Sequence, residues 1–148
     1  MTTRLEVTEK ILEKKILQGL KWSEIADKVG LSKEWVTAGC LGQMTFDDRV
    51  AQEIGEIFDL TDFEISLLKV PPYRGSLPSQ VPTDPLIYRL YEIVMVYGTT
   101  IKELIHEEFG DGIMSAIDFE MDISRQPDPK GDRVKLEMSG KYLAYRTY

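Results

Sequence analysis

The chain has 148 residues, enough for one domain of typical size or for two small ones. A hydrophobic content of 43% and a charged content of 29% are ordinary for a globular protein and exclude an intrinsically disordered chain. The net charge of -7, with neither half of the chain basic, disfavours binding to nucleic acids.

Cysteine and histidine each occur once, as Cys40 and His106. A single cysteine cannot form an intrachain disulfide, and one histidine cannot supply the cluster of ligands that a zinc site needs. We therefore predict no metal and no cofactor. The N-terminal MTTRLEVTEK lacks the apolar core of a signal peptide, and no apolar run approaches the roughly 18 residues of a membrane span. We expect a soluble, cytoplasmic protein with no membrane partner.

Residues 5–69 show helical periodicity throughout, interrupted by turn-like separators such as VGLS and FDLTD. We predict four or five short helices packed as an N-terminal all-α bundle. Ser23, Ser32 and Thr61 are the expected N-caps, because each precedes a carboxylate in the following helical turn.

Within this region, residues 22–43 resemble the helix-turn-helix of repressor-type DNA-binding domains, with Gly30 at the turn. A DNA-binding regulator would place the second helix in the major groove. That helix offers only Lys33 against Glu34, and the half of the chain around it is acidic. We therefore favour a bundle that serves packing and assembly, with no nucleic-acid partner.

The next sixteen residues, VPPYRGSLPSQVPTDP, contain five prolines, too many for a helix or a central strand. This stretch is typical of an extended connector between two structural regions. We place the domain boundary here, with an N-terminal helical bundle over residues 1–75 and a smaller C-terminal α+β domain over residues 76–148. The predicted fold class of the whole chain is α+β.

The second region begins with a helix from Pro85, capped by Asp84 and ended by Gly98. A second helix should start at Thr100, with Glu103 completing a capping box, and should stop at Gly110. Apolar and acidic residues then alternate over 113–123, and a similar alternation follows a polar turn over 133–143. These two stretches predict a β-hairpin with one buried face.

Two charged residues, Arg89 and Glu92, lie on the first of these helices, which is otherwise apolar on nearly every side. A helix of this kind is normally buried, and an unpaired buried charge costs several kcal/mol or more. We expect the two to be partnered, because positions three apart are neighbours on a helix. They form either a structural ion pair or a guanidinium aimed at an anionic ligand and oriented by the carboxylate.

Ser115 stands on the apolar face of the first predicted strand, between Ile113 and Ile117. A hydroxyl on such a face commonly bonds to nearby backbone, which would make it structural. Together with Arg89 and Glu92, it would also place a cation, a carboxylate and a hydroxyl near one interior. The pattern alone leaves both interpretations open.

The stretch VPTDPLIYRLYEIVMVYGTTIKELIHEEFGDGIMSAIDFEMDI, residues 81–123, resembles the C-terminal catalytic region of the cyanate hydratase (cyanase) family. The similarity continues through DPKGDRVKLEMSGKYL, residues 128–143, and the helical N-terminal part also suits this family. A block of this length is far more specific than a short motif.

The resemblance implies that the chain is a lyase that decomposes cyanate with bicarbonate as co-substrate, through a carbamate-type intermediate, to ammonia and carbon dioxide. It implies that Arg89, Glu92 and Ser115 are the catalytic residues.

It also implies a homodecamer built from dimers with active sites shared between subunits. An oligomer also agrees with the net charge. In an acidic chain a single arginine offsets only part of the charge of two bound anions, whereas a site between symmetric subunits gathers the same arginine from more than one chain. The alternatives are a DNA-binding regulator and a non-catalytic oligomeric scaffold, in which the three polar residues would be structural.

Overall fold

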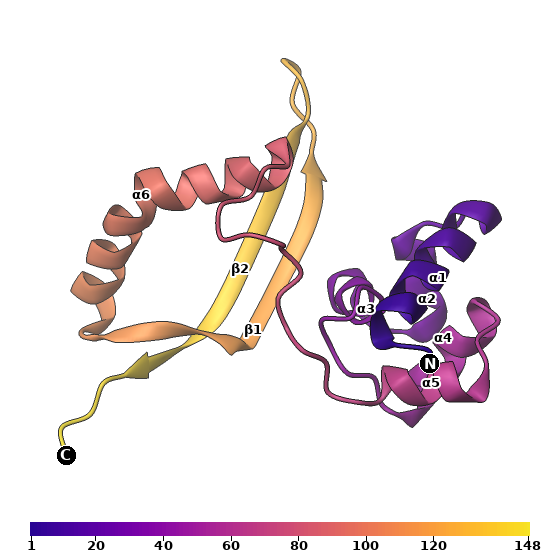
Figure 1. Cartoon of the computed structure of the whole chain (residues 1–148). Helices are drawn as coiled ribbons and strands as arrows, with labels where there is room; N and C mark the ends of the chain where they lie inside the picture. The colour runs from indigo at the N-terminus through magenta and orange to yellow at the C-terminus, as the bar shows by residue number, and fades with distance from the viewer. The chain divides into compact units, whose positions relative to one another are not determined.

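The computed structural model describes all residues, 1–148, and divides into two compact units, Met1–Ser76 and Leu77–Tyr148. The division falls within the proline-rich stretch, where the chain runs without helix or strand (Figure 1). No helix combines the length and the apolar character needed to cross a membrane.

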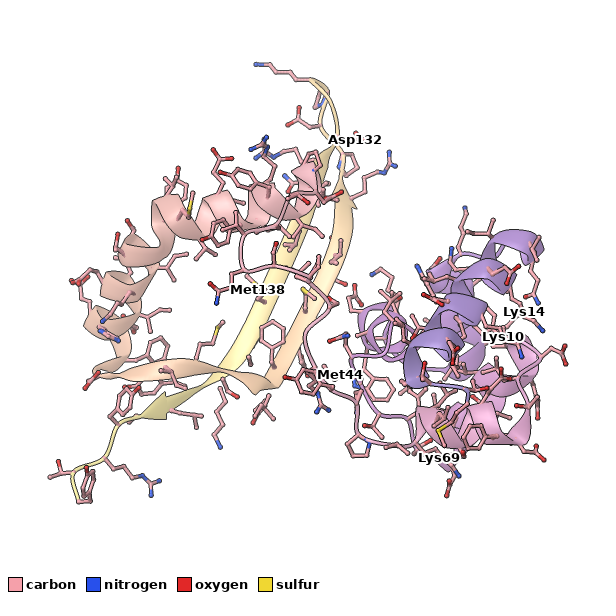
Figure 2. The ribbon with its side chains drawn as sticks, in the orientation of Figure 1. Lys10, Lys14, Met44, Lys69, Asp132 and Met138 are labelled. Atoms are coloured by element: carbon pink, nitrogen blue, oxygen red, sulfur yellow. The ribbon has the colours of Figure 1, made fainter.

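The first unit is a bundle of five short helices, as predicted, and it contains the hydrophobic core. The core includes Cys40, Phe46, Phe58 and Ile54, all almost completely shielded from solvent. Ion pairs join helices across its surface, for example Lys10 Nζ to Glu64 Oε2 at 2.7 Å (Lys10 is labelled in Figure 2). The helices are α1 (Arg4–Gln18), α2 (Trp22–Val29), α3 (Lys33–Cys40), α4 (Asp48–Ile57) and α5 (Asp62–Leu68).

Two of the three predicted N-caps in this unit are confirmed. The hydroxyls of Ser32 and Thr61 accept hydrogen bonds from backbone N–H groups in the first turns of α3 and α5. The prediction for Ser23 is wrong, because α2 begins at Trp22 and its N-cap is Lys21, two residues before Ser23. There the N–H of Lys21 donates to the Glu24 carboxylate at 2.7 Å, so a glutamate of the first turn caps the helix instead of a serine.

In the second unit, α6 (Pro85–Phe109) is one continuous helix, so the prediction of two helices is wrong. The start and the stop are confirmed, since Asp84 Oδ1 accepts from the N–H of Leu86 at 2.9 Å and Gly110 follows the last turn. Gly98 lies inside the helix, where glycine costs only about 1 kcal/mol relative to alanine. The strong helix formers on both sides outweigh this penalty.

The predicted hairpin is confirmed: β1 (Gly112–Gln126) pairs with β2 (Arg133–Ala144) in antiparallel fashion. The pairing is regular except between Met114 and Phe119, where residues 115–118 of β1 lie opposite Lys141 alone. This bulge interrupts the simple alternation that we predicted, because extra residues on one strand change which face the following side chains occupy.

The second unit has almost no core of its own. No residue of α6 is buried, and apolar side chains on both strands are exposed as well. The expectation of a buried helix and a buried strand face is therefore not met within a single chain. A helix and a two-stranded sheet are too few elements to bury each other's apolar side chains. The exposed apolar residues on α6 are Leu86, Ile87, Leu90, Ile93, Val94, Met95, Val96, Tyr97, Ile101, Leu104 and Phe109.

Candidate active site

Arg89 and Glu92 form the ion pair that their spacing predicted. Arg89 Nη1 donates to Glu92 Oε2 at 2.6 Å, one helical turn apart on α6. Their side chains are 62% and 47% exposed, so the pair is not withdrawn from water in a single chain. An exposed pair of this kind adds little to stability, typically below about 1 kcal/mol. The ion pair alone therefore does not explain why an otherwise apolar helix carries two charged residues.

Tyr88, which the sequence reasoning missed, lies beside this pair. Its ring centroid is 5.6 Å from the Arg89 guanidinium carbon, within the range of a cation–π contact. The ring also packs against that of Tyr91, with centroids 6.2 Å apart. The only signal in the sequence is the aromatic residue directly before the arginine.

Ser115 is buried, with 6% exposure, and it organises the bulge in β1. Its Oγ accepts hydrogen bonds from the backbone N–H groups of Ile117 at 3.0 Å and Asp118 at 2.9 Å. The structural interpretation, a hydroxyl bonded to nearby backbone, therefore holds. Both bonds use the oxygen as acceptor, which leaves the hydroxyl proton able to donate to a ligand.

Gly140 of β2 packs directly against the bulge. A Cβ at this position would lie 2.5 Å from Met114 Cγ and would also overlap the carbonyl oxygen of Ser115. Only glycine fits here without moving the bulge. Nothing in the local sequence marks Gly140, because the contact depends on how β1 and β2 are aligned.

No hydrogen bond joins Ser115 to Arg89 or Glu92 within one chain. The hollow on the hairpin does not contain them either. It is lined by Met121, Met138 (labelled in Figure 2), Ser139 and three acidic residues, which suit an anion poorly. The structure thus pairs two of the three predicted site residues and leaves the third apart.

His106 and Cys40 lie outside this group. His106 Nδ1 is 3.2 Å from Lys102 Nζ, and its Nε2 is 3.2 Å from the carbonyl oxygen of Gly112, so the ring joins the end of α6 to the start of β1. Burial raises the pKa of the Cys40 thiol to about 12, although the nearby Arg4 opposes this shift. A thiol with so high a pKa is protonated near neutral pH and is a poor nucleophile. No cluster of three or more potential metal ligands is present.

Comparison with known proteins decides the family. Residues 4–72 match the family model described as cyanate hydratase, N-terminal, and residues 79–147 match the cyanate lyase C-terminal domain. The chain belongs to the cyanate hydratase family. As a member of the cyanase family it is an enzyme, a lyase.

Similar proteins support this assignment along the whole chain. Cyanate hydratases from Polynucleobacter asymbioticus and from a Polaromonas species are each 70% identical over 98% of this chain and 99% of their own length. The crystal structure of cyanase from T. urticae has a TM-score of 0.82 and 35% identity, and it covers 93% of this chain and 96% of that one. The helical bundle that resembles a DNA-binding module is therefore the N-terminal part of the cyanase fold. In α3 the only cation, Lys33, is paired with Glu34 at 2.7 Å.

Proposed function

We propose that this chain decomposes cyanate in a bicarbonate-dependent reaction that releases ammonia and carbon dioxide. The observation that carries the proposal is the Arg89–Glu92 pair, held at 2.6 Å on a helix inside the matched cyanate lyase domain. Relatives that bear the name cyanate hydratase at 70% identity give the substrate.

The proposed reaction joins two anions. A bicarbonate oxygen attacks the cyanate carbon, and the new C–O bond gives a mixed carbamate whose carboxylate then leaves as carbon dioxide. The carbamate that remains loses a second carbon dioxide as its nitrogen becomes ammonia. The balance is one cyanate, one bicarbonate and two protons to one ammonia and two carbon dioxide molecules. The protein must therefore hold two like charges together and allow protons to reach the nitrogen.

Arg89 supplies the charge in this scheme. A guanidinium has five N–H donors in one plane, and only one of them is used in the bond to Glu92. The other donors are available to reduce the repulsion between the two anions. They can also stabilise the negative charge that develops on the cyanate nitrogen and oxygen. Glu92 anchors one nitrogen of the guanidinium, and its carboxylate would relay a proton to the cyanate nitrogen.

Ser115 serves as a hydrogen-bond donor rather than as a nucleophile. Its oxygen already accepts two backbone N–H groups, and no base lies beside it to remove its proton. The two accepted bonds polarise the hydroxyl and strengthen it as a donor toward an anion. Burial and the bulge fix the direction in which it points.

The site is completed by neighbouring subunits in this proposal. A single chain leaves the apolar surface of α6 uncovered, and such a surface marks an interface. Packing between copies would remove water from Arg89 and Glu92 and would bring Ser115 beside the substrate anion that Arg89 of another chain holds. We propose the homodecamer built from dimers that the family resemblance implies.

Ammonia release from cyanate tests the proposal, measured in carbonate-free buffer with and without added bicarbonate. We expect release only when both anions are present, and about two carbon dioxide molecules for each ammonia. No need for bicarbonate would overturn the proposed chemistry. If no ammonia is released under any condition, the chain is an oligomeric scaffold without catalytic activity.

A further inference from the structure

The ring of Tyr88 contacts the guanidinium of Arg89. We propose that Tyr88 is a positioning residue whose ring face holds the guanidinium of Arg89 in the orientation that binds the two anions. The inference rests on the proposed function, because it concerns the arginine of that site. The guanidinium carbon lies 5.6 Å from the ring centroid.

The carboxylate of Glu92 cannot hold the guanidinium by itself. It makes one bond, to Nη1, and the two side chains are 62% and 47% exposed. A single hydrogen bond restrains Nη1 but leaves the torsions of the arginine side chain free to tilt the guanidinium plane, and in an isolated chain a pair this exposed is weak. A second contact of a different kind is needed to set the plane, and the Tyr88 ring is the one that the structure provides.

An aromatic ring suits this task better than a second carboxylate. A carboxylate would occupy more of the N–H donors and would cancel the positive charge that the anions need. A ring contacts the face of the guanidinium and leaves its in-plane donors available, because those donors lie along the edges. Tyr88 therefore orients the cation without competing with the substrates.

The ring of Tyr88 is itself supported. It packs against Tyr91 with ring centroids 6.2 Å apart and an angle of 43° between the planes. Tyr88, Tyr91 and Glu92 are also the half-buried positions in this stretch of an otherwise exposed helix. A braced ring loses less freedom on binding than a free one, which favours a role in preorganisation.

The test compares Tyr88→Leu, which removes the ring, with Tyr88→Phe, which keeps the ring and removes only the hydroxyl. Tyr73→Leu is the matched control, because Tyr73 is 98% exposed and has no ring contact. Azide is the probe, since it is a linear anion with the same electron count as cyanate and does not turn over. Its dissociation constant is measured by calorimetry, alongside kcat/KM for cyanate and the assembly state of each variant.

We expect Tyr88→Leu to raise the azide dissociation constant about fivefold and to lower kcat/KM by a similar factor, with the assembly unchanged. Tyr73→Leu should match the parent protein, and Tyr88→Phe, which keeps the ring, should retain most of the azide affinity that Tyr88→Leu loses. A merely structural role would reduce the fraction of active protein and leave the azide constant unchanged, which would overturn the proposal. If Tyr88→Phe and Tyr88→Leu lose azide affinity equally, the hydroxyl and not the ring is responsible, and the proposal is overturned.

Azide binding and turnover are measured separately, so the two proposals fail separately. If the parent protein binds azide and releases no ammonia from cyanate, the proposed function fails while the positioning of Arg89 is still decided by the azide constants. If the parent protein is active and Tyr88→Leu binds azide as the parent does, the positioning role alone fails.

Discussion

Gly140→Ala is the sharpest test that the position of Ser115 matters for turnover. A Cβ at position 140 would lie 2.5 Å from Met114 Cγ, whereas real Cβ contacts essentially never fall below 3.0 Å. The same Cβ would overlap the carbonyl oxygen of Ser115. A flexible methionine can turn away, but a backbone carbonyl moves only if the bulge moves. The bulge must therefore shift by more than about half an ångström.

A shift of this size is enough to affect catalysis. A misplacement of about 1 Å in an active site can lower the rate about a hundredfold, so we expect Gly140→Ala to lower kcat/KM by tenfold or more. The overpacking should cost about 1–3 kcal/mol of stability, which leaves a folded protein. Ammonia release gives the rate, and thermal unfolding with sedimentation verifies the fold and the assembly.

The double variant Met114→Ala with Gly140→Ala separates the two contacts. Removing the methionine side chain relieves its clash and leaves the overlap with the Ser115 carbonyl. If the displaced serine causes the loss, the double variant stays as slow as Gly140→Ala, and Met114→Ala alone is close to the parent protein. Recovery of activity in the double variant, or full activity in folded Gly140→Ala, would refute the reasoning.

Three further predictions concern Arg89, the assembly and acid stability. Arg89→Lys keeps the charge and loses the planar fork, so kcat/KM for cyanate should fall about a hundredfold, and near-normal turnover would remove Arg89 from the site. Ile117, 98% exposed at the bulge, should lie at an interface between copies, so Ile117→Asp should shift sedimentation toward smaller species, while sedimentation unchanged from the parent protein would contradict this. The hydrogen bond from Lys10, together with the N–H of Thr61, lowers the pKa of Glu64 below its ordinary value of 4.5. Because the pKa of Glu64 is lower in the folded state than in the unfolded state, its carboxylate stabilises the fold at pH values above the unfolded-state pKa. This contribution is lost as the pH falls through the folded-state pKa. The melting temperature should therefore drop more between pH 5 and pH 3 for the parent protein than for Glu64→Gln, and equal drops would exclude this role.

Features decided by neighbouring residues were predicted well from the sequence. The five-helix bundle, the caps at Ser32, Thr61 and Asp84, and the Arg89–Glu92 pair all depend on contacts within a few positions. Such contacts repeat with the period of the helix, so the order of residues is sufficient to infer them.

Features decided by opposing signals or by distant residues were predicted poorly. Gly98 carries a stop signal, and the residues around it outweigh that signal. The bulge at Ser115 depends on Gly140 in the other strand, and a strand alternation considered alone cannot reveal such an alignment. The separation of Ser115 from the ion pair has the same origin, because no local pattern says whether α6 covers β1 within one chain.

The contrast between the two units explains why stability and activity should respond differently to mutation. The first unit buries its own core, so its folding is decided within one chain. In the second unit, Arg89 and Glu92 lie on α6, which buries no residue, so in the proposed assembly their desolvation comes from other copies. Burial is what strengthens the attraction of Arg89 for small anions, because water weakens it in the isolated chain. Assembly would then be required for activity. Dilution below the concentration at which the copies assemble should therefore abolish turnover, while the first unit stays folded.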